Sequence, residues 1–338
     1  MNLNLDALGI IIIGRNEGKH LEKALDSIPE GIDSILYVDS GSTDGSPDMV
    51  RARGISVHEL DPEKPFSAAR ARREGVDILI NQSPSLKWFQ FLDGDCTFES
   101  EWCQTAVDHI ALNENIGIVC GFLSEEAPDL SVFNKMNSLR WKADSKGEID
   151  ACGGIFLVRR TAYEQAGGFN DMLLTGEEAE FCSRIRKAGH LIVRLDCKMA
   201  QHDSDLISFS DWWKRAVWGG YGDAIQYDIL ESGISNKQRK KIFSSLLWSF
   251  IMPGLFLIGV FFSFWKLYGL LGSVLILLTY CALFSKIYAE RRRQGDNKNN
   301  AALYSIFCVI RKFPHALGFV RYILNSKSLK KSPDPHAS

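Results

Sequence analysis

Two aspartates in the segment WFQFLDGDCTF, Asp93 and Asp95, follow an aromatic run and are separated by a single glycine. Two carboxylates this close repel each other unless a cation lies between them, and carboxylate oxygens suit Mg²⁺ or Mn²⁺. The same tripeptide also favours a tight turn. Taken alone it leaves a metal site and a plain turn as alternatives, and the neighbouring sequence must decide between them.

The aromatic run is one of three short apolar segments that predict buried strands. Uninterrupted runs of this kind are typical of parallel strands covered on both faces of a sheet. They occupy residues 9–13, 34–40 and 87–93. Helical patterns alternate with them at residues 19–27, 47–53 and 65–80. This alternation predicts a doubly wound α/β domain with a mostly parallel sheet.

Polar residues and glycines follow each of the three expected strands. The segments are GRNE (residues 14–17), DSGSTDGS (residues 39–46) and DGDC (residues 93–96). In doubly wound sheets, ligands bind beyond the carboxyl ends of the strands. We therefore expect these segments to converge on one rim, which favours the metal site over the plain turn.

Charge is distributed unevenly along the chain. Residues 1–236 carry 23 Lys and Arg against 38 Asp and Glu, whereas residues 237–338 carry 16 against 3. This asymmetry indicates two regions with different partners.

The eight cysteines form no CxxC pair, so neither a zinc site nor a disulfide framework is indicated. No nucleic-acid-binding motif appears, and we expect no nucleic-acid partner.

The basic region contains two uncharged apolar runs, at residues 244–264 and 267–285. Each is near the roughly 20 residues that a helix needs to cross a bilayer. Only Trp265 and Lys266 separate the runs, which predicts a hairpin, and basic residues on both flanks place both of its ends in the cytoplasm. A re-entrant hairpin and a pair of buried core helices are the alternatives.

The remaining C-terminal sequence is less apolar. Residues 301–324 mix apolar and basic side chains, which favours helices lying at the membrane surface, and the tail KSLKKSPDPHAS is expected to be disordered. The opening residues MNLNLDALG lack a basic start, so we expect no signal peptide. We therefore predict a reduced, cytosolic domain at residues 1–236, a transmembrane or re-entrant hairpin at 237–290, and juxtamembrane helices with a basic tail at 291–338.

Five segments, in this order, resemble those of the family 2 glycosyltransferases, the inverting nucleotide-sugar enzymes with a GT-A fold. IIIGRNEGKHLEKALDSI resembles the opening strand and helix, VDSGSTDGS the base-binding segment, and FLDGDC the D-x-D metal motif. GGIFLVRRTAYEQAGGFND and GEEAEFCSRIRKAGH resemble the acceptor-side strand and the catalytic helix. The resemblance covers roughly residues 9–225 and implies a GT-A domain that binds a nucleotide sugar.

The resemblance also assigns donor-binding residues. Six of them would hold the nucleoside of a UDP- or GDP-sugar: Gly14, Arg15, Asn16, Glu17, Asp39 and Asp44. Asp44 has capping of the following helix as its alternative role. Arg70 and Arg72 would reach the pyrophosphate, because a guanidinium fork matches phosphate oxygens, although helix arginines are also often simply solvated.

The same resemblance assigns the metal ligands. Asp95 would bind Mg²⁺ or Mn²⁺, with Asp93 taking part through water or the ribose, and the cation would stabilise the departing diphosphate as a Lewis acid. His202 follows a strand expected at residues 190–194, and it either completes the metal shell or is structural.

A general base is needed to activate the acceptor hydroxyl. The family places an aspartate for this role after a glutamate at the head of a helix, and here Glu178 occupies that position with Glu177 before it. Because glutamate has a different reach, either residue is a candidate base. The alternative is an acidic helix N-terminus stabilised by the helix dipole, with Glu180 and Arg184 as an i, i+4 pair.

Two further segments have a functional and a structural interpretation. Gly153 and Gly154 would let the sugar or acceptor approach the backbone, or they bend a strand. Arg215, in SDWWKRAVWGGYG, would contact the diphosphate or a lipid-linked acceptor phosphate. The tryptophans of this segment suit a membrane interface, sugar stacking or packing of an amphipathic helix.

The resulting hypothesis is a membrane-anchored, metal-dependent, inverting glycosyltransferase at the cytoplasmic face. Its expected partners are a nucleotide-sugar donor, a lipid-linked or cell-envelope saccharide acceptor, and membrane lipids. One alternative is direct transfer to a polyprenyl phosphate. Another is a catalytically silent nucleotide-binding scaffold of a polysaccharide assembly complex, which only the glutamate at position 178 favours.

Overall fold

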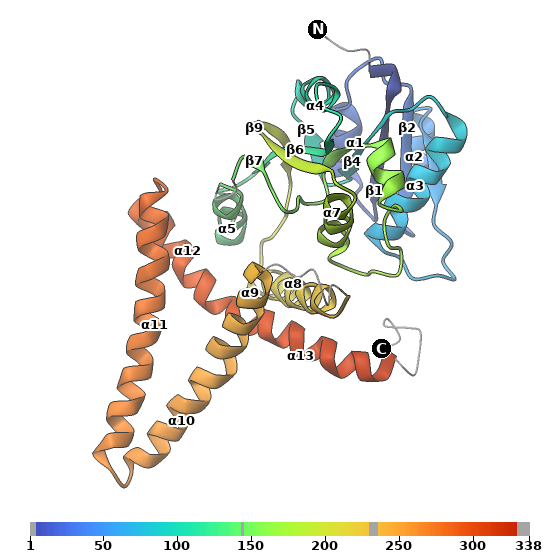
Figure 1. The fold of residues 1–338 in the computed structure, drawn as a ribbon. Helices are drawn as coiled ribbons and strands as arrows, with labels where there is room; N and C mark the ends of the chain where they lie inside the picture. The colour runs from blue at the N-terminus through green and yellow to red at the C-terminus, as the bar shows by residue number, and fades with distance from the viewer. Residues whose placement is uncertain (1–4, 143–144, 230–235, 330–338) are drawn as a thin grey trace. The chain divides into compact units, whose positions relative to one another are not determined.

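The computed structural model describes residues 5–142, 145–229 and 236–329 (Figure 1). The expected disorder of the tail therefore concerns residues that lie almost entirely outside the described ones. The chain forms two compact units, one of Met1–Asp129 with Asp144–Asp205 and the other of Leu130–Ala143 with Leu206–Ser338. The first unit ends before residue 236, because helix α8 (Phe209–Ile229) packs on the C-terminal helix α13 (Lys312–Leu329).

One mixed sheet is the framework of the first unit. Its strands follow the order β3-β2-β1-β4-β8-β6-β9-β5, and β7 pairs with β9. The first four in this order are parallel to one another, antiparallel pairing begins between β4 and β8, and β6 and β9 are again parallel. The strands are β1 (Leu8–Gly14), β2 (Ser34–Asp39), β3 (Ser56–Glu59), β4 (Trp88–Asp93), β5 (Cys96–Phe98), β6 (Ile116–Glu125), β7 (Gly147–Glu148), β8 (Phe156–Arg159) and β9 (Leu191–His202). The α/β prediction is confirmed.

Strand register brings the predicted polar segments to one edge of the sheet. Strand β1 pairs with β2 and β4 on its two sides, so that Ile13 lies opposite both Val38 and Asp93. Gly14 lies opposite Asp39 in the same way. The three segments that follow β1, β2 and β4 therefore start from the same rim, as the apolar runs predicted.

Helices pack on this sheet and fix its core. They are α1 (Lys19–Asp26), α2 (Ser46–Ala52), α3 (Ala68–Gln82), α4 (Trp102–Ala111), α6 (Arg160–Gln165) and α7 (Glu177–Lys187), after a 3-10 turn at Leu5–Ala7. The expected helix at 65–80 begins at Ala68, because the Ser67 hydroxyl accepts a hydrogen bond from the backbone N–H of Arg70 and caps it. Helix α3 approaches β1 closely at Gly75, where a Cβ atom would lie 2.7 Å from Cγ2 of Ile11.

The second unit is helical. It comprises α5 (Val132–Trp141), α8, α9 (Asn236–Leu246), α10 (Met252–Ser263), α11 (Leu267–Arg293), α12 (Lys298–Ile310) and α13. A π-helical turn, Leu247–Ile251, joins α9 to α10 directly before Pro253. Proline lacks the backbone N–H that would continue the helical hydrogen bonding, and the irregular turn lies directly N-terminal to this residue.

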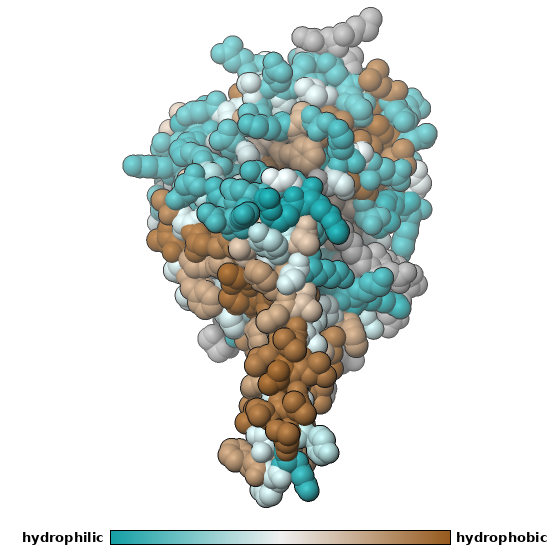
Figure 2. Space-filling view, turned by 90° about the vertical axis from the view of Figure 1, so that its left-hand side faces the viewer, coloured by the Kyte–Doolittle hydropathy of each residue, from teal (hydrophilic) through white to brown (hydrophobic). Residues whose placement is uncertain are grey.

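Three helical stretches of the second unit are long and apolar enough to cross a membrane: Arg239–Ser263, Leu267–Arg293 and Lys298–Asn325. The first two are the predicted hairpin, and Figure 2 shows hydrophobic side chains over it at the lower end of the view. The third is the least apolar of the three and corresponds to the segment expected at the membrane surface. That surface position stays a prediction.

Small residues allow α10 and α11 to approach each other closely. A Cβ atom at Gly269 would lie 2.3 Å from the backbone nitrogen of Ser263. The Ser273 hydroxyl donates to the backbone oxygen of Phe256, 3.2 Å away, across the two helices. Close backbone approach and interhelical hydrogen bonds stabilise helix pairs in a bilayer, where hydrophobic burial between helices contributes little.

Candidate active site

A buried arginine, Arg72 on α3, connects three carboxylates from two other elements. Its Nη2 donates to Oδ1 of Asp93, at the end of β4, at 2.9 Å. Its Nη1 donates to Oε1 of Glu177, the first residue of α7, at 2.8 Å and lies 3.7 Å from Oε1 of Glu178. With only 2 % of its surface exposed, Arg72 holds these elements together from inside the protein.

The positive charge of Arg72 and the negative charges of its neighbouring carboxylates stabilise one another. Burial acts to lower the pKa of Arg72, but the carboxylates of Asp93, Glu178 and Glu177 more than offset it and raise this pKa, so the guanidinium stays charged. For Asp93, burial raises the pKa and the Arg72 charge opposes the rise. Sequence reasoning placed Arg72 on the pyrophosphate, whereas in the structure its donors serve the protein's own carboxylates.

Gly154 lies against this ion pair. A Cβ atom at this position would lie 2.3 Å from Nη2 of Arg72 and 2.9 Å from Oδ2 of Asp93. At the neighbouring Gly153, a Cβ atom would meet nothing within 4 Å. The glycine at 154 therefore provides the space that the arginine and aspartate occupy, a role that the sequence did not reveal.

Asp95 and His202 form a candidate metal centre. Strand β5 pairs with β9 so that Cys96 lies opposite His202, which places the imidazole beside the preceding aspartate. Oδ2 of Asp95 lies 3.2 Å from Nε2 of His202. Donor atoms of Asp95, Cys96 and His202 all lie within 4.8 Å of one another. A carboxylate oxygen and an imidazole nitrogen at this spacing fit a Mg²⁺ or Mn²⁺ ion.

The Cys96 thiol is a poor ligand in this group. Burial first, and then the neighbouring Asp95 and Asp93 carboxylates, raise its pKa well above the ordinary value of a thiol. A neutral thiol binds hard cations weakly, since the thiolate is the ligand form. Its contact with Oδ1 of Asp95, at 3.2 Å, is instead that of a hydrogen-bond donor.

A second layer of residues orients the imidazole. Nδ1 of His202 lies 3.2 Å from the Ser204 hydroxyl, and Glu125 in turn accepts a hydrogen bond from the backbone N–H of Ser204 at 2.9 Å. Partners on the far side of a histidine fix which nitrogen faces the metal. His202 is the last residue of β9, which extends eight residues beyond the expected end at residue 194. The sequence did not predict a role for either Ser204 or Glu125. Only the position of Ser204, two residues after His202, could have indicated a partner for the imidazole.

A further carboxylate, Glu17, lies against the Asp-Gly-Asp turn. A Cβ atom at Gly94 would lie 2.8 Å from Cγ of Glu17. Burial and the charge of Asp95 raise the pKa of Glu17. Glu17 was expected to bind the nucleoside, and the structure places it next to the candidate metal centre.

The segments after β1 and β2 are tied together by hydrogen bonds. The side-chain oxygen of Asn16 accepts from the backbone N–H of Thr43 at 2.7 Å, and the Asn16 N–H donates to the Ser42 hydroxyl at 2.8 Å. Asn16 takes the left-handed conformation, with φ 58°, which asparagine tolerates better than most residues. Arg15 lies with its guanidinium carbon 5.5 Å from the centre of the Phe66 ring.

The two aspartates of the second segment organise its backbone. Asp39 is 1 % exposed, and its carboxylate accepts from the backbone N–H groups of Gly41 and Ser42 and from the Tyr37 hydroxyl. Asp44 accepts from the backbone N–H of Ser46, the first residue of α2, at 3.0 Å. Both carboxylates thus hold the segment in shape, although the N-cap of α2 is Gly45 and not Asp44.

Arg70 is engaged by its own loop. Its Nε donates to Glu74 at 2.7 Å, and its Nη1 donates to the backbone oxygens of Asp61 and Lys64. Glu74 also contacts His58 at 2.7 Å. These contacts fix the loop before α3. They give Arg70 a different role from Arg72, although the sequence offered both as ligands of the pyrophosphate.

The structure separates the two candidate bases. Glu177 is 5 % exposed and is bound to Arg72, whereas the side chain of Glu178 is 25 % exposed. Burial and the adjacent Glu177 charge raise the pKa of Glu178 to about 7, although Arg72 opposes the rise. A carboxyl group with this pKa can accept a proton near neutral pH. The expected pair of Glu180 with Arg184 is also present, at 2.6 Å.

Arg215 belongs to the second unit. It is exposed on α8, whereas Trp212 on the same helix is buried in a small cluster with Phe133 and Leu206. Trp218 is largely exposed. Packing therefore accounts for Trp212, and the proposed phosphate contact of Arg215 stays a prediction.

A family model described as Glycosyl transferase family 2 matches residues 9–167. The chain is 24% identical over 203 residues to glycosyltransferase AglE of Haloferax volcanii, covering 56% of this chain and 64% of that protein. It is 23% identical over 205 residues to the succinoglycan biosynthesis protein ExoA of Rhizobium meliloti, covering 55% of this chain and 60% of the relative. The matches thus span less than two thirds of the length of either relative.

Among solved structures, the mannosyltransferase PcManGT of Pyrobaculum calidifontis has a similar fold. The TM-score is 0.51 at 16% identity, and the match covers 96% of this chain and 88% of that one. The sheet has the fold of a GT-A domain. The chain carries a family 2 glycosyltransferase domain, followed by apolar helices of the kind found in membrane-associated proteins.

Replacing Gly154 by alanine tests the packing of the Arg72–Asp93 pair. We expect Gly154→Ala to lower the free energy of unfolding by about 1–3 kcal/mol, because the new methyl group must displace a buried guanidinium. Gly153→Ala is the matched control, and its effect should stay within about 0.5 kcal/mol. Chemical denaturation of both variants in detergent measures the difference, and equal destabilisation would contradict the described contact.

Proposed function

We propose that this protein transfers a sugar from a UDP- or GDP-sugar to a lipid-linked or cell-envelope saccharide, with inversion at the anomeric carbon and with Mg²⁺ or Mn²⁺. The observation that carries the proposal is the joining of Asp93, Glu177 and Glu178 through Arg72. It connects the segment of the candidate metal centre to the helix that carries the candidate base. A nucleotide-binding scaffold would have no need of that connection.

Asp95 and His202, with Asp93 beside them, would hold the divalent cation. When bound, such an ion stabilises the negative charge that develops on a departing nucleoside diphosphate. The Pyrobaculum mannosyltransferase was solved with GDP-Man and Mn2+, and we extend this donor class to the present chain as part of the proposal. Glu125 and Ser204 act through His202 by keeping its Nε2 directed at Asp95.

The segments after β1 and β2 would form the nucleoside pocket. Asn16 and Asp39 hold the two segments against each other through backbone hydrogen bonds, so the pocket is formed before the donor binds. Preorganised groups bind more tightly because less ordering is needed on binding. Arg15 and Phe66, which stack at the same segments, present a cationic and an aromatic surface for the base and ribose.

Glu178 is the proposed general base. Its carboxylate would remove the proton from the acceptor hydroxyl as the hydroxyl attacks the anomeric carbon from the face opposite the leaving diphosphate. Glu177 is a positioning residue, because its charge is bound to Arg72 and its proximity raises the pKa of Glu178. The structure therefore favours the residue that the family resemblance placed at the base position.

The acceptor is proposed to be carried on a lipid at the cytoplasmic face. Three apolar helices follow the domain, and basic residues flank the first two. Positive charge next to spanning segments is retained on the cytoplasmic side. One of the relatives carries the name of a polysaccharide biosynthesis protein, which agrees with a saccharide acceptor.

Metal binding gives one test of the proposal. We expect Asp95→Asn to abolish the thermal stabilisation that a nucleoside diphosphate gives in the presence of Mn²⁺. Ser204→Ala should weaken Mn²⁺ binding by about 10- to 100-fold, because it removes only the partner that orients His202. Asp171→Asn, at an exposed position of the same unit, is the control. Unchanged Mn²⁺-dependent stabilisation in Asp95→Asn would refute this metal centre.

The pH dependence of transfer gives a second test. The base must be deprotonated, so kcat/KM should fall about tenfold per unit as the pH drops below the value of about 7 for Glu178. Glu178→Gln should reduce the rate by about 10²- to 10⁴-fold and remove this limb of the profile. A transfer rate that is flat across this range with saturating Mn²⁺ would exclude Glu178 as the base.

Stability separates lost catalysis from lost folding in the same variant. The pKa of Glu178 is raised in the folded protein above its ordinary value, so deprotonation destabilises the folded state as the pH rises through about 7. Glu178→Gln should therefore melt at a higher temperature than the parent at about pH 8, and the difference should shrink below about pH 5. A lower melting temperature at both values would point to misfolding instead.

A further inference from the structure

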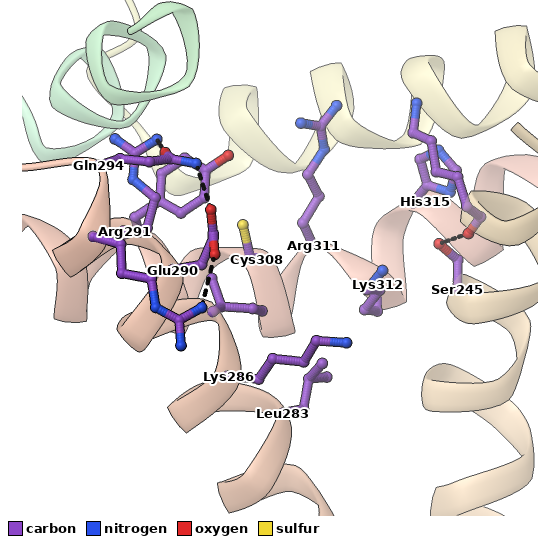
Figure 3. Close-up of a pocket in the computed structure, with 14 residues that line it drawn as sticks. Ser245, Leu283, Lys286, Glu290, Arg291, Gln294, Cys308, Arg311, Lys312 and His315 are labelled. Atoms are coloured by element: carbon purple, nitrogen blue, oxygen red, sulfur yellow. Dashed lines mark hydrogen bonds and ion pairs between the residues drawn. The ribbon is translucent and has the colours of Figure 1, made fainter. Parts of the chain in front are cut away.

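The second unit contains a basic cavity of about 690 Å³ (Figure 3). We use the name basic cavity for this pocket, which is lined by residues of α9, α11, α12 and α13 together with Arg311. Six Lys and Arg residues line it, against a single acidic residue, Glu290. An excess of positive charge around a pocket favours an anionic occupant.

Some of this charge is already balanced inside the unit. Lys241 contacts Asp223 at 2.5 Å, and Arg293 contacts Glu290 at 3.5 Å. Arg291 is paired with Asp296 and stacks on the Tyr304 ring, with 4.2 Å between its guanidinium carbon and the ring centre. These three cations therefore need no external anion.

The other three cations are not balanced in this way. Lys286, Arg311 and Lys312 make no ion pair with any carboxylate of the described residues. The Lys312 ammonium donates only to the Ser244 hydroxyl, at 3.0 Å. In Figure 3, Lys286 extends from α11 toward the side of the cavity where Lys312 lies, whereas the Arg311 side chain points away from Lys286. Several cations gathered without counter-charges repel one another, and a bound anion would remove that repulsion.

The position of the cavity along the helices indicates where its occupant comes from. Lys286 is the first charged residue after the apolar run of α11, and Lys241 lies just before the apolar run that continues into α10. Residues at the ends of spanning segments lie at the level of the lipid head groups. Leu283 and Ile287 of α11 add an apolar part to the lining. A cavity with cations and an apolar wall at this depth suits a phosphate attached to a hydrocarbon chain.

We propose that the basic cavity binds the phosphate end of a lipid, with Lys286 and Lys312 as its main ligands and Arg311 as a further cation of its lining. Arginine and lysine donors form charge-assisted hydrogen bonds to phosphate oxygens. The identification of this lipid as the isoprenoid carrier of the acceptor rests on the proposed function. An anionic phospholipid presents the same phosphate chemistry, so the experiment has to distinguish the two sources.

The experiment uses the full-length protein and measures lipid binding directly. Native mass spectrometry in a neutral detergent would follow titrations with a long-chain polyprenyl phosphate, the corresponding polyprenol and phosphatidylglycerol. The test variant is the triple change of Lys286, Arg311 and Lys312 to Gln. Its control removes the same charge from exposed residues that do not line the cavity: Lys266, Lys298 and Arg321.

We expect the parent to bind polyprenyl phosphate at least about tenfold more tightly than polyprenol, and the test variant to lose about tenfold or more in this affinity. The control variant should bind like the parent. Preference for polyprenyl phosphate over phosphatidylglycerol would identify the acceptor carrier, whereas equal binding of both would keep the lipid-phosphate site and exclude that assignment. Equal affinity for phosphate and polyprenol, or an unaffected test variant, would overturn the proposal.

A second measurement separates this site from the active site. Stabilisation by a nucleoside diphosphate with Mn²⁺ reports on the first unit and should be the same in the parent and the triple variant. If the parent shows no stabilisation by a nucleoside diphosphate with Mn²⁺ but still binds lipid phosphate specifically, the proposed function alone would be refuted. Intact nucleotide stabilisation with no phosphate-specific lipid binding would refute the lipid site alone.

Discussion

The buried charge of Arg72 is the constraint on which the first unit depends. A guanidinium that is almost fully removed from water is strongly destabilising unless it is paired and hydrogen-bonded. The end of β4 and the beginning of α7 must therefore both be in place, since they supply Asp93 and Glu177. The glycine at position 154 is part of the same constraint, because any side chain there would occupy the space of the ion pair.

This arrangement also divides the carboxylates between different tasks. Glu177 and Glu178 are adjacent, but Arg72 lies 2.8 Å from Glu177 and 3.7 Å from Glu178, and burial together with the neighbouring Glu177 raises the pKa of Glu178. A titratable group whose surroundings shift its pKa strongly is a common candidate for a catalytic role. Asp95 differs from both, because it lies 3.2 Å from Nε2 of His202 in the candidate metal centre.

The second unit handles charge in another way. Its helices expose apolar side chains such as Leu257 and Leu275, each more than half exposed, along the segments able to span a membrane. Its cations gather near the ends of these segments, and six of them line the basic cavity. The strong asymmetry of charge along the sequence thus matches the division of the chain into an acidic α/β region and a basic helical region whose helices are apolar enough to cross a membrane.

The sequence by itself determined the alternating strands and helices, the common rim of Gly14, Asp39 and Asp93, and the hairpin of apolar helices, because periodicity and uninterrupted apolar runs are local properties. It also named His202, although it ended the preceding strand too early. It could not separate Arg70 from Arg72, or Glu177 from Glu178, since neighbours in sequence differ only in what they contact. The tertiary structure decided these roles through the pairing of β5 with β9, the meeting of α3 with α7 and the depth of burial, which arise from contacts between residues far apart in the chain.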